Sequence, residues 1–145
     1  LPWRDVPGYI SAQFAGAVLG VIVAHFMFGH EWIAPSEHVR AGNAQMFSEF
    51  VATFGLLSVI LGCSRAKSES VPFAVAAYIT GAYWFTASTS FANPAVTLAR
   101  SATDTFAGIR PEDVPWFVVA QLAGATLARV FARWLIRPPA RSIPQ

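Results

Sequence analysis

The stretch from residue 88 to residue 113, "STSFANPAVTLARSATDTFAGIRPED", is too polar for a complete membrane span and too apolar for an ordinary loop. Asn93 followed by Pro94 is a helix-start signal, because asparagine caps free N–H groups and proline fits the first turn. Residues 94–103 are predicted to form a helix of about 15 Å, half a membrane thickness, before Gly108 and Pro111 break the chain. Such a helix predicts a re-entrant segment, which is tolerated at membrane depth only where it is buried in protein or lines a water-filled cavity.

On either side of this stretch the sequence consists mainly of long apolar segments. Four of them, at about 7–28, 44–62, 71–88 and 115–136, have roughly 18–22 residues, or about 27–33 Å as helix, which matches a hydrocarbon core. Since 54% of all residues are apolar and only 12% are charged, the composition favours a membrane protein over a soluble one. The formal charge of +2, without a basic run, gives no indication of a nucleic-acid partner.

The beginning of the chain carries few further signals. It starts at Leu1 rather than Met and shows no signal peptide, so we expect a fragment or a truncated reading frame. Cys63 is the single cysteine, which excludes an intramolecular disulfide and favours a small apolar filler at a helix end.

Two segments are nearly the same: "VPGYISAQFAGAVLG" (6–20) and "VPWFVVAQLAGATLAR" (114–129). Three crossings separate their starts, because a re-entrant loop returns to the side it left. The two helices should therefore point in opposite directions, as in an inverted-topology repeat. Most Lys and Arg residues fall on one side, which predicts that this side is cytoplasmic. That side holds Arg4, Arg65, Lys67, Arg133, Arg137 and Arg141, and the other holds Arg40 and Arg110.

Several motifs resemble the aquaporin, or major intrinsic protein, family. "NPA" opens a half-helix between two spans, "AQFAGA" and "AQLAGA" resemble the third and sixth helices of that family, and "FSEFVATFGLL" (47–57) resembles its fourth. The resemblance implies an all-α membrane protein, a right-handed bundle of four transmembrane helices plus one re-entrant NPA half-helix. Within one domain, 1–145, residues 6–28 would be the last helix of the first repeat, 44–136 the second repeat and 137–145 a cytoplasmic tail.

Asn93 is the first candidate pore residue. As N-cap, its carboxamide oxygen can accept from backbone N–H groups, which leaves its NH₂ for a passing solute. The alternative is a plain Asn-Pro turn. The resemblance adds Pro94 and Ala95 to the motif, and it implies that the backbone carbonyls of Ser90, Phe91 and Ala92 form an acceptor ladder; ordinary solvated loop backbone is the other interpretation.

Three positions of the family's outer filter can be placed: Gly81, Ser90 and Val96. The family usually has an arginine where Val96 stands, so the resemblance implies a wider filter that repels cations less, as in pores for polyols, urea or metalloid hydroxides. Val96 could also simply pack. Arg100, one helical turn further out, could supply a charge at the outer mouth, or snorkel to the interface.

Glu49 lies inside a span, where a carboxylate is costly. The resemblance implies that it accepts hydrogen bonds from the re-entrant backbone as a scaffold; a proton relay is the alternative. Small residues around Gly16 and Gly124 predict close helix approach, with the two similar helices packed symmetrically, and Gln13 and Gln121 are expected to bond across helices without touching solute. His25, His30 and His38 lack the spacing of a metal site, so neither metal nor cofactor is expected.

These observations predict a passive channel, not an enzyme, for small neutral solutes such as glycerol, urea and metalloid hydroxides, with water as a further candidate. It would be a multi-pass protein of a bacterial inner membrane, in contact with lipid, with a cytoplasmic C-terminus, and the resemblance implies a homotetramer if the protein is complete. Two alternatives stay open: an inactive or assembly-dependent half channel, and, with less support, a membrane-embedded enzyme, for which no nucleophile–base set is visible.

Overall fold

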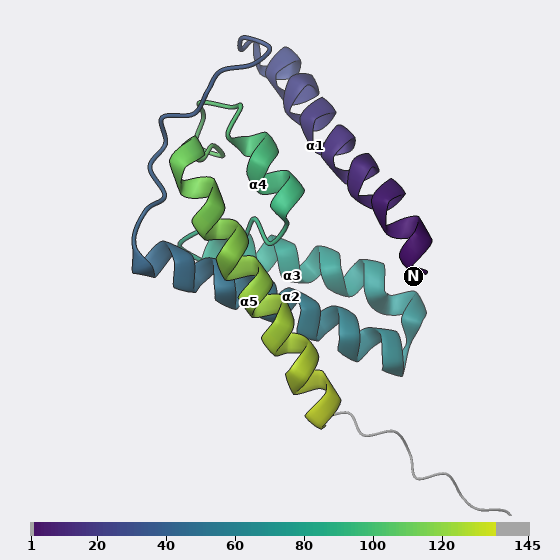
Figure 1. Cartoon of the computed structure of the whole chain (residues 1–145). Helices are drawn as coiled ribbons and strands as arrows, with labels where there is room; N and C mark the ends of the chain where they lie inside the picture. The colour runs from purple at the N-terminus through teal and green to yellow at the C-terminus, as the bar shows by residue number, and fades with distance from the viewer. Residues whose placement is uncertain (1, 136–145) are drawn as a thin grey trace, which may run out of the picture.

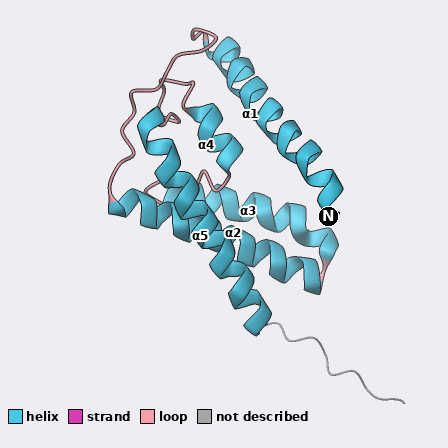
Figure 2. Ribbon diagram, in the orientation of Figure 1, coloured by secondary structure: helices cyan, strands magenta, loops and turns pink. Residues whose placement is uncertain are grey.

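The computed structural model describes residues 2–135, and within them it contains helices and no strand (Figure 2). The five α-helices are α1 (Val6–Phe28), α2 (Asn43–Ala66), α3 (Val71–Phe85), α4 (Pro94–Arg100) and α5 (Val114–Leu135). Single 3₁₀ turns, Trp3–Asp5, Ser68–Ser70 and Pro111–Asp113, precede α1, α3 and α5. The predicted tail at 137–145, the predicted last span residue Ile136, and both Arg137 and Arg141 lie outside the described residues.

Three of the predicted spans reach membrane length. Within residues 2–135, the helical stretches Trp3–Phe28, Asn43–Ala66 and Pro111–Leu135 are long and apolar enough to cross a bilayer. Pro7 stands in the first turn of α1, as predicted, and Gly29 ends that helix in the left-handed conformation (φ 69°), which a glycine adopts without strain. The all-α membrane architecture is therefore confirmed.

The predicted third span is shorter than expected. α3 has 15 residues and ends at Phe85, not near Ser88, which gives about 22 Å of helix. The chain leaves the helix at Thr86, whose backbone is extended and whose hydroxyl donates to the carbonyl of Ala82. The polar residues that follow are used to build the loop that leads into α4.

The half-helix is also shorter than predicted, with seven residues, 94–100, in place of 94–103. The loop that follows α1 contacts this end of α4. Its backbone N–H groups at Ala34 and Ser36 donate to the carbonyls of Ala102 and Ser101, at 3.0 and 2.9 Å. After Arg100 the N–H groups of Ser101, Ala102 and Thr103 donate to carbonyls three residues earlier, so the α-helical pattern ends there, and the loop after α1 binds the carbonyls that follow.

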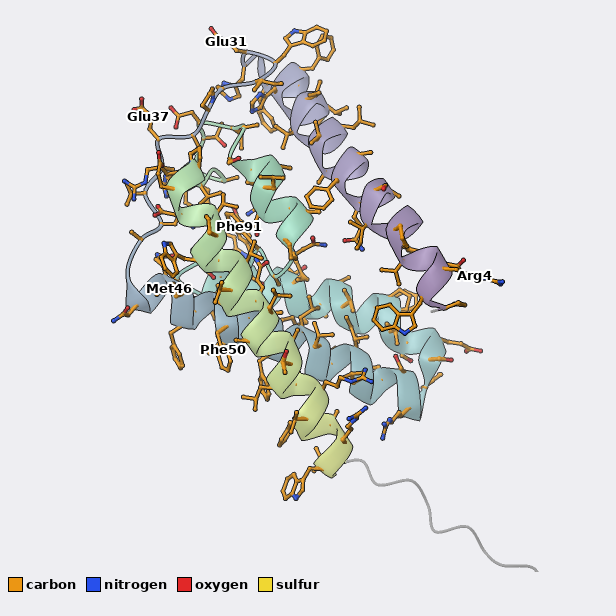
Figure 3. The ribbon with its side chains drawn as sticks, viewed as in Figure 1. Arg4, Glu31, Glu37, Met46, Phe50 and Phe91 are labelled. Carbon is orange, nitrogen blue, oxygen red and sulfur yellow. The ribbon has the colours of Figure 1, made fainter. Side chains whose placement is uncertain are left out.

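α5 packs chiefly on α2, α3 packs on α2, and α4 lies between α1 and α5 (Figure 1). α1 and α5 run in opposite senses, and the end of α1 and the start of α5 lie together near the loops at one end of the molecule (Figure 1). Gly124 permits the close contact of α5 with α2, since a Cβ there would lie 2.5 Å from the carbonyl oxygen of Phe50, a residue labelled in Figure 3.

The expected symmetric packing of the two similar helices is wrong for the described residues. A Cβ on Gly16, the counterpart of Gly124, would meet nothing within 4 Å. α1 makes its helix contacts with α4, and Gly16 does not lie at that interface. The same short motif thus closes one interface in α5 and faces open space in α1.

Candidate functional site

The N-terminus of α4 is capped by Asn93 as predicted. Its backbone is extended, and its side-chain oxygen accepts from the N–H groups of Ala95 and Val96, at 2.8 and 3.4 Å. The Nδ2 group of Asn93 donates to Oε1 of Gln13 on α1, at 3.3 Å, and Gln13 is exposed. Gln13 does bond across to another segment, but its partner is the candidate pore residue itself.

The loop before Asn93 has an unusual backbone. Thr89, Ser90 and Ala92 have φ angles of 59°, 50° and 47°, the left-handed region that non-glycine residues rarely adopt. Each such residue costs on the order of 1–3 kcal/mol, so the surrounding structure has to hold it. Among the described residues, nothing donates a hydrogen bond to the carbonyl oxygens of Ser90, Phe91 and Ala92. These three oxygens therefore have no donor among the described residues, although the residues that carry them are buried and do not line the cavity beside α4.

The side chain of Glu49, on α2, accepts hydrogen bonds from this loop. Its carboxylate is fully buried and accepts from the backbone N–H groups of Phe91, at 3.2 Å, and Ala92. The side-chain amide of Gln121, on α5, donates to Glu49 at 2.9 Å and to the hydroxyl of Thr97 at 2.8 Å. The expected hydrogen bonds of Glu49 and Gln121 are thus present, and they join α2, α5 and α4 in one buried network.

Arg40, in the loop after α1, ties both flanks of α4 together. Its guanidinium donates to the carbonyl of Ser88 before α4, at 3.1 Å, and to those of Phe106 and Gly108 after it, at 2.9 and 2.7 Å. Its backbone N–H donates to the carboxylate of Asp113 at 2.9 Å. The loop before α4 and the loop after it are therefore held together at one side chain. Burial, and next the charge of Arg100, hold the pKa of Arg40 below its usual range.

Sequence reasoning counted Arg40 only as a charge on the outer side, and it also left His25 without a role. His25 is buried at the end of α1. Its Nδ1 lies 2.5 Å from the carbonyl oxygen of Glu31, and its Nε2 lies 2.6 Å from the hydroxyl of Thr103. This pair attaches α1 to the loop after α4, across 78 positions of sequence.

A cavity of about 600 Å³ lies beside α4 on the side of α1. Its wall includes Val96 and Arg100 of α4, Tyr83 of α3, and residues of α1 and of the loops that follow α1 and α4. Of the three predicted filter positions, only Val96 lines it. Gly81 is exposed, with only the Phe85 ring, 3.9 Å away, near a Cβ built there, and Ser90 is buried with an unpartnered hydroxyl. The structure of residues 2–135 does not bring the three positions into one cavity.

The chain has three membrane-length helices and one short capped helix, α4, whose flanking loops are held together. This arrangement defines a multi-pass, all-α membrane protein. The chain is 56% identical over 135 residues to the aquaglyceroporin AqpS of Rhizobium meliloti (strain 1021), a match that covers 93% of this chain and 58% of that protein. It is also 37% identical over 83 residues to aquaporin NIP1-1 of Oryza sativa subsp. japonica, covering 54% and 29% of the two chains. A probable glycerol uptake facilitator protein of Thermotoga maritima is 30% identical over 78 residues, 46% and 33% of the two chains.

The chain belongs to the aquaporin, or major intrinsic protein, family. It spans a little over half the length of the Rhizobium protein and about a third of the length of the other two. No protein-family model matches the chain, and no solved structure matches it significantly.

Proposed function

We propose that this chain forms part of a passive transmembrane channel of the aquaglyceroporin type. Its solutes would be small and uncharged, such as glycerol, urea and metalloid hydroxides, with water as a further candidate. The carrying observation is that Arg40 bonds to carbonyls on both flanks of α4. A seven-residue helix, about 10 Å long, whose two flanks meet at one side chain cannot cross a bilayer. It is suited to bring a capped helix end and free carbonyls to a passage.

In this proposal Asn93, with Pro94 and Ala95 behind it, presents the passage with a hydrogen-bond donor, and Gln13 lies beside it. The carbonyl oxygens of Ser90, Phe91 and Ala92 act as acceptors. A solute with hydroxyl or amide groups can exchange its water hydrogen bonds for these. Glu49 and Gln121 hold the loop as a scaffold and do not relay protons, because the hydrogen-bond partners of the carboxylate within residues 2–135 are neutral backbone or amide donors.

Of the three proposed filter positions, Gly81, Ser90 and Val96, only Val96 lines the cavity, and none of the three is an arginine. Val96 offers neither the fixed charge nor the five donors of arginine, which supports a wider opening than a water-selective filter. The name of the Rhizobium relative, an aquaglyceroporin, and that of the Thermotoga relative, a glycerol uptake facilitator, support neutral solutes of this size.

The arrangement in the membrane is part of the same proposal. Residues 6–28 would form the last helix of a first repeat, 44–136 a second repeat, and 137–145 a cytoplasmic tail in a bacterial inner membrane. Lipid contact is supported by large apolar side chains exposed on the outside, among them Phe73, Trp84 and Trp134. The complete protein would assemble as a homotetramer.

The test is stopped-flow light scattering on phosphatidylethanolamine–phosphatidylglycerol vesicles that carry the purified chain. Glycerol and urea should enter faster than into empty vesicles. Flux equal to that of empty vesicles would refute the channel for this chain and favour the second candidate, a half channel without transport of its own. Sequencing the DNA upstream of the Leu1 codon for three further spans and another NPA motif then identifies the unit that transports.

A further inference from the structure

Arg100 lines the cavity beside α4, and its side chain makes no hydrogen bond or ion pair with the described residues, while the buried Glu49 carboxylate acts on its charge only at longer range. Its side chain donates no hydrogen bond to residues 2–135, and its Nη1 is buried. The nearby carboxylates are used elsewhere: Asp104 accepts from the N–H of Glu37, Asp113 binds Arg40 and Arg110, and Glu49 binds the loop and Gln121. A buried guanidinium N–H is costly when unpaired, and Nη1 of Arg100 has no acceptor among the described residues.

The position of Arg100 is nevertheless fixed. Its Cζ lies 4.3 Å from the centre of the Phe91 ring, and the Cζ of Arg40 lies 4.9 Å from the same centre. Phe91, labelled in Figure 3, is buried and packs against the ring of Phe117 on α5, with centroids 5.3 Å apart. Arg40 is itself held by three carbonyls. Arg100 is thus stacked on a rigid aromatic support that holds the cation without cancelling its charge.

The other residues of the cavity wall do not offset this charge. The wall carries Tyr83, Thr103, Thr105, His25 and His30 as its other polar side chains, and no Asp or Glu. Val96, one turn earlier on the same face of α4, adds only apolar surface. A cation entering this cavity would meet Arg100 in its wall, whereas Asn93, at the other end of α4, does not line the cavity.

We propose that Arg100 is the fixed positive charge of the outer vestibule and determines specificity there, by excluding small cations from a passage that carries no charge at Val96. This inference rests on the proposed channel function and deepens it. In this proposal Arg100 selects solutes by charge, and Val96 selects them by size. Neutral solutes with acceptor oxygens, such as urea and polyols, are admitted, and cations of equal size are turned away.

Urea and guanidinium, a neutral solute and a cation of nearly the same shape, are the probes. In vesicles with the chain, the ratio of guanidinium to urea permeability should be far below one. Arg100→Met keeps an apolar stem on Phe91 but removes the charge, and it should raise this ratio about tenfold, as expected for one unit charge at short range in a partly aqueous site. Arg100→Lys should keep the ratio low. Arg110→Gln, which removes another arginine from the same end of the molecule, is the matched control and should leave the ratio unchanged.

The outcomes separate this inference from the proposed function. If glycerol and urea both fail to enter, the channel function falls, and the role of Arg100 falls with it. If urea enters but Arg100→Met changes the ratio by less than about twofold, within the range expected for a fully screened charge, the channel stands and the inference is overturned. A second measurement needs no variant: raising the ionic strength from about 0.01 M to about 1 M shortens the Debye length from about 30 Å to about 3 Å and should raise the wild-type ratio. A ratio near one already at low salt overturns the inference.

Discussion

The side-chain amide of Gln121 donates a 2.9 Å hydrogen bond to the buried carboxylate of Glu49 across the interface of α5 and α2. The same carboxylate accepts from two backbone N–H groups of the loop before α4. Three elements that are distant in sequence therefore share one acceptor, and the loop that leads to Asn93 has the geometry that this acceptor imposes.

Glu49→Ala should destabilise the protein, because it leaves two buried N–H groups and one amide without an acceptor, at about 1–3 kcal/mol for each group. Glu49→Gln keeps one acceptor oxygen and should lose less stability than Glu49→Ala. Thermal unfolding in detergent, followed by intrinsic fluorescence, should give the highest unfolding temperature for the wild type, a lower one for Glu49→Gln and the lowest for Glu49→Ala. Equal unfolding temperatures for wild type and Glu49→Ala would contradict the scaffold role.

Asn93→Ser separates the cap of α4 from the proposed pore donor. The serine hydroxyl can still accept from the first N–H groups of the helix, so the unfolding temperature should stay close to that of the wild type. Since the NH₂ group is lost, glycerol and urea flux should fall. Asn93→Ala loses both functions, and the missing cap should cost about 1 kcal/mol of stability. Normal flux in a stable Asn93→Ser variant would show that the carboxamide NH₂ is not used.

Val96→Arg introduces a bulky charged side chain at the proposed wide filter. It should lower the flux of glycerol or arsenous acid more than that of water, because the larger solutes need the space that valine leaves. Stopped-flow measurements with each solute on the same vesicle preparation give the ratio. If all fluxes fell equally, Val96 would not act as a filter position.

Gly124→Ala and Gly16→Ala form a matched pair in the two related helices. At Gly124 the new methyl group would meet the Phe50 carbonyl oxygen at 2.5 Å, so overpacking should cost about 1–3 kcal/mol. At Gly16 the methyl group meets nothing within 4 Å, and the higher helix propensity of alanine favours the variant by up to about 1 kcal/mol. Unfolding temperatures measured side by side test this. A large loss for Gly16→Ala would reveal a packing surface for that face of α1.

Arg40→Lys should loosen both loops that flank α4, although the charge is kept. A lysine ammonium cannot replace the planar fork that reaches three carbonyls at once. Hydrogen exchange of the peptides that cover 86–92 and 101–110 should rise in both regions, with the α2–α5 interface unchanged. Faster exchange in only one of the two loops would contradict the shared attachment.

The parts of this architecture that the sequence predicts are those with local signals. Long apolar blocks mark the spans, Asn93-Pro94 marks the start of α4, and the glutamate early in the second span marks the scaffold acceptor through the family resemblance. The sequence predicts the end of α3 near Ser88, whereas the helix ends at Phe85, because the polar residues from Thr86 onward form the loop that leads into α4.

The contacts of Arg40 and the left-handed backbone of Thr89, Ser90 and Ala92 were not predictable. The acceptors of Arg40 are main-chain carbonyls, which every residue carries, so no spacing in the sequence marks them. A left-handed backbone conformation is usually predicted where the sequence has a glycine, and there is no glycine at these three positions. His25 and Thr103 meet only because two loops come together, and neither residue type indicates the other.

The bond from Gln121 to Thr97 has a consequence for the order in which the chain is assembled. α4 leaves the ribosome before α5, yet one of its buried hydroxyls and its supporting carboxylate are both completed by a side chain of α5. The half-helix can pack on α1 as it is synthesised, but its buried contacts are completed only when the last helix arrives. Translation arrested before Gln121 should leave the segment around Asn93 open to proteases, and release of the finished chain should seal it.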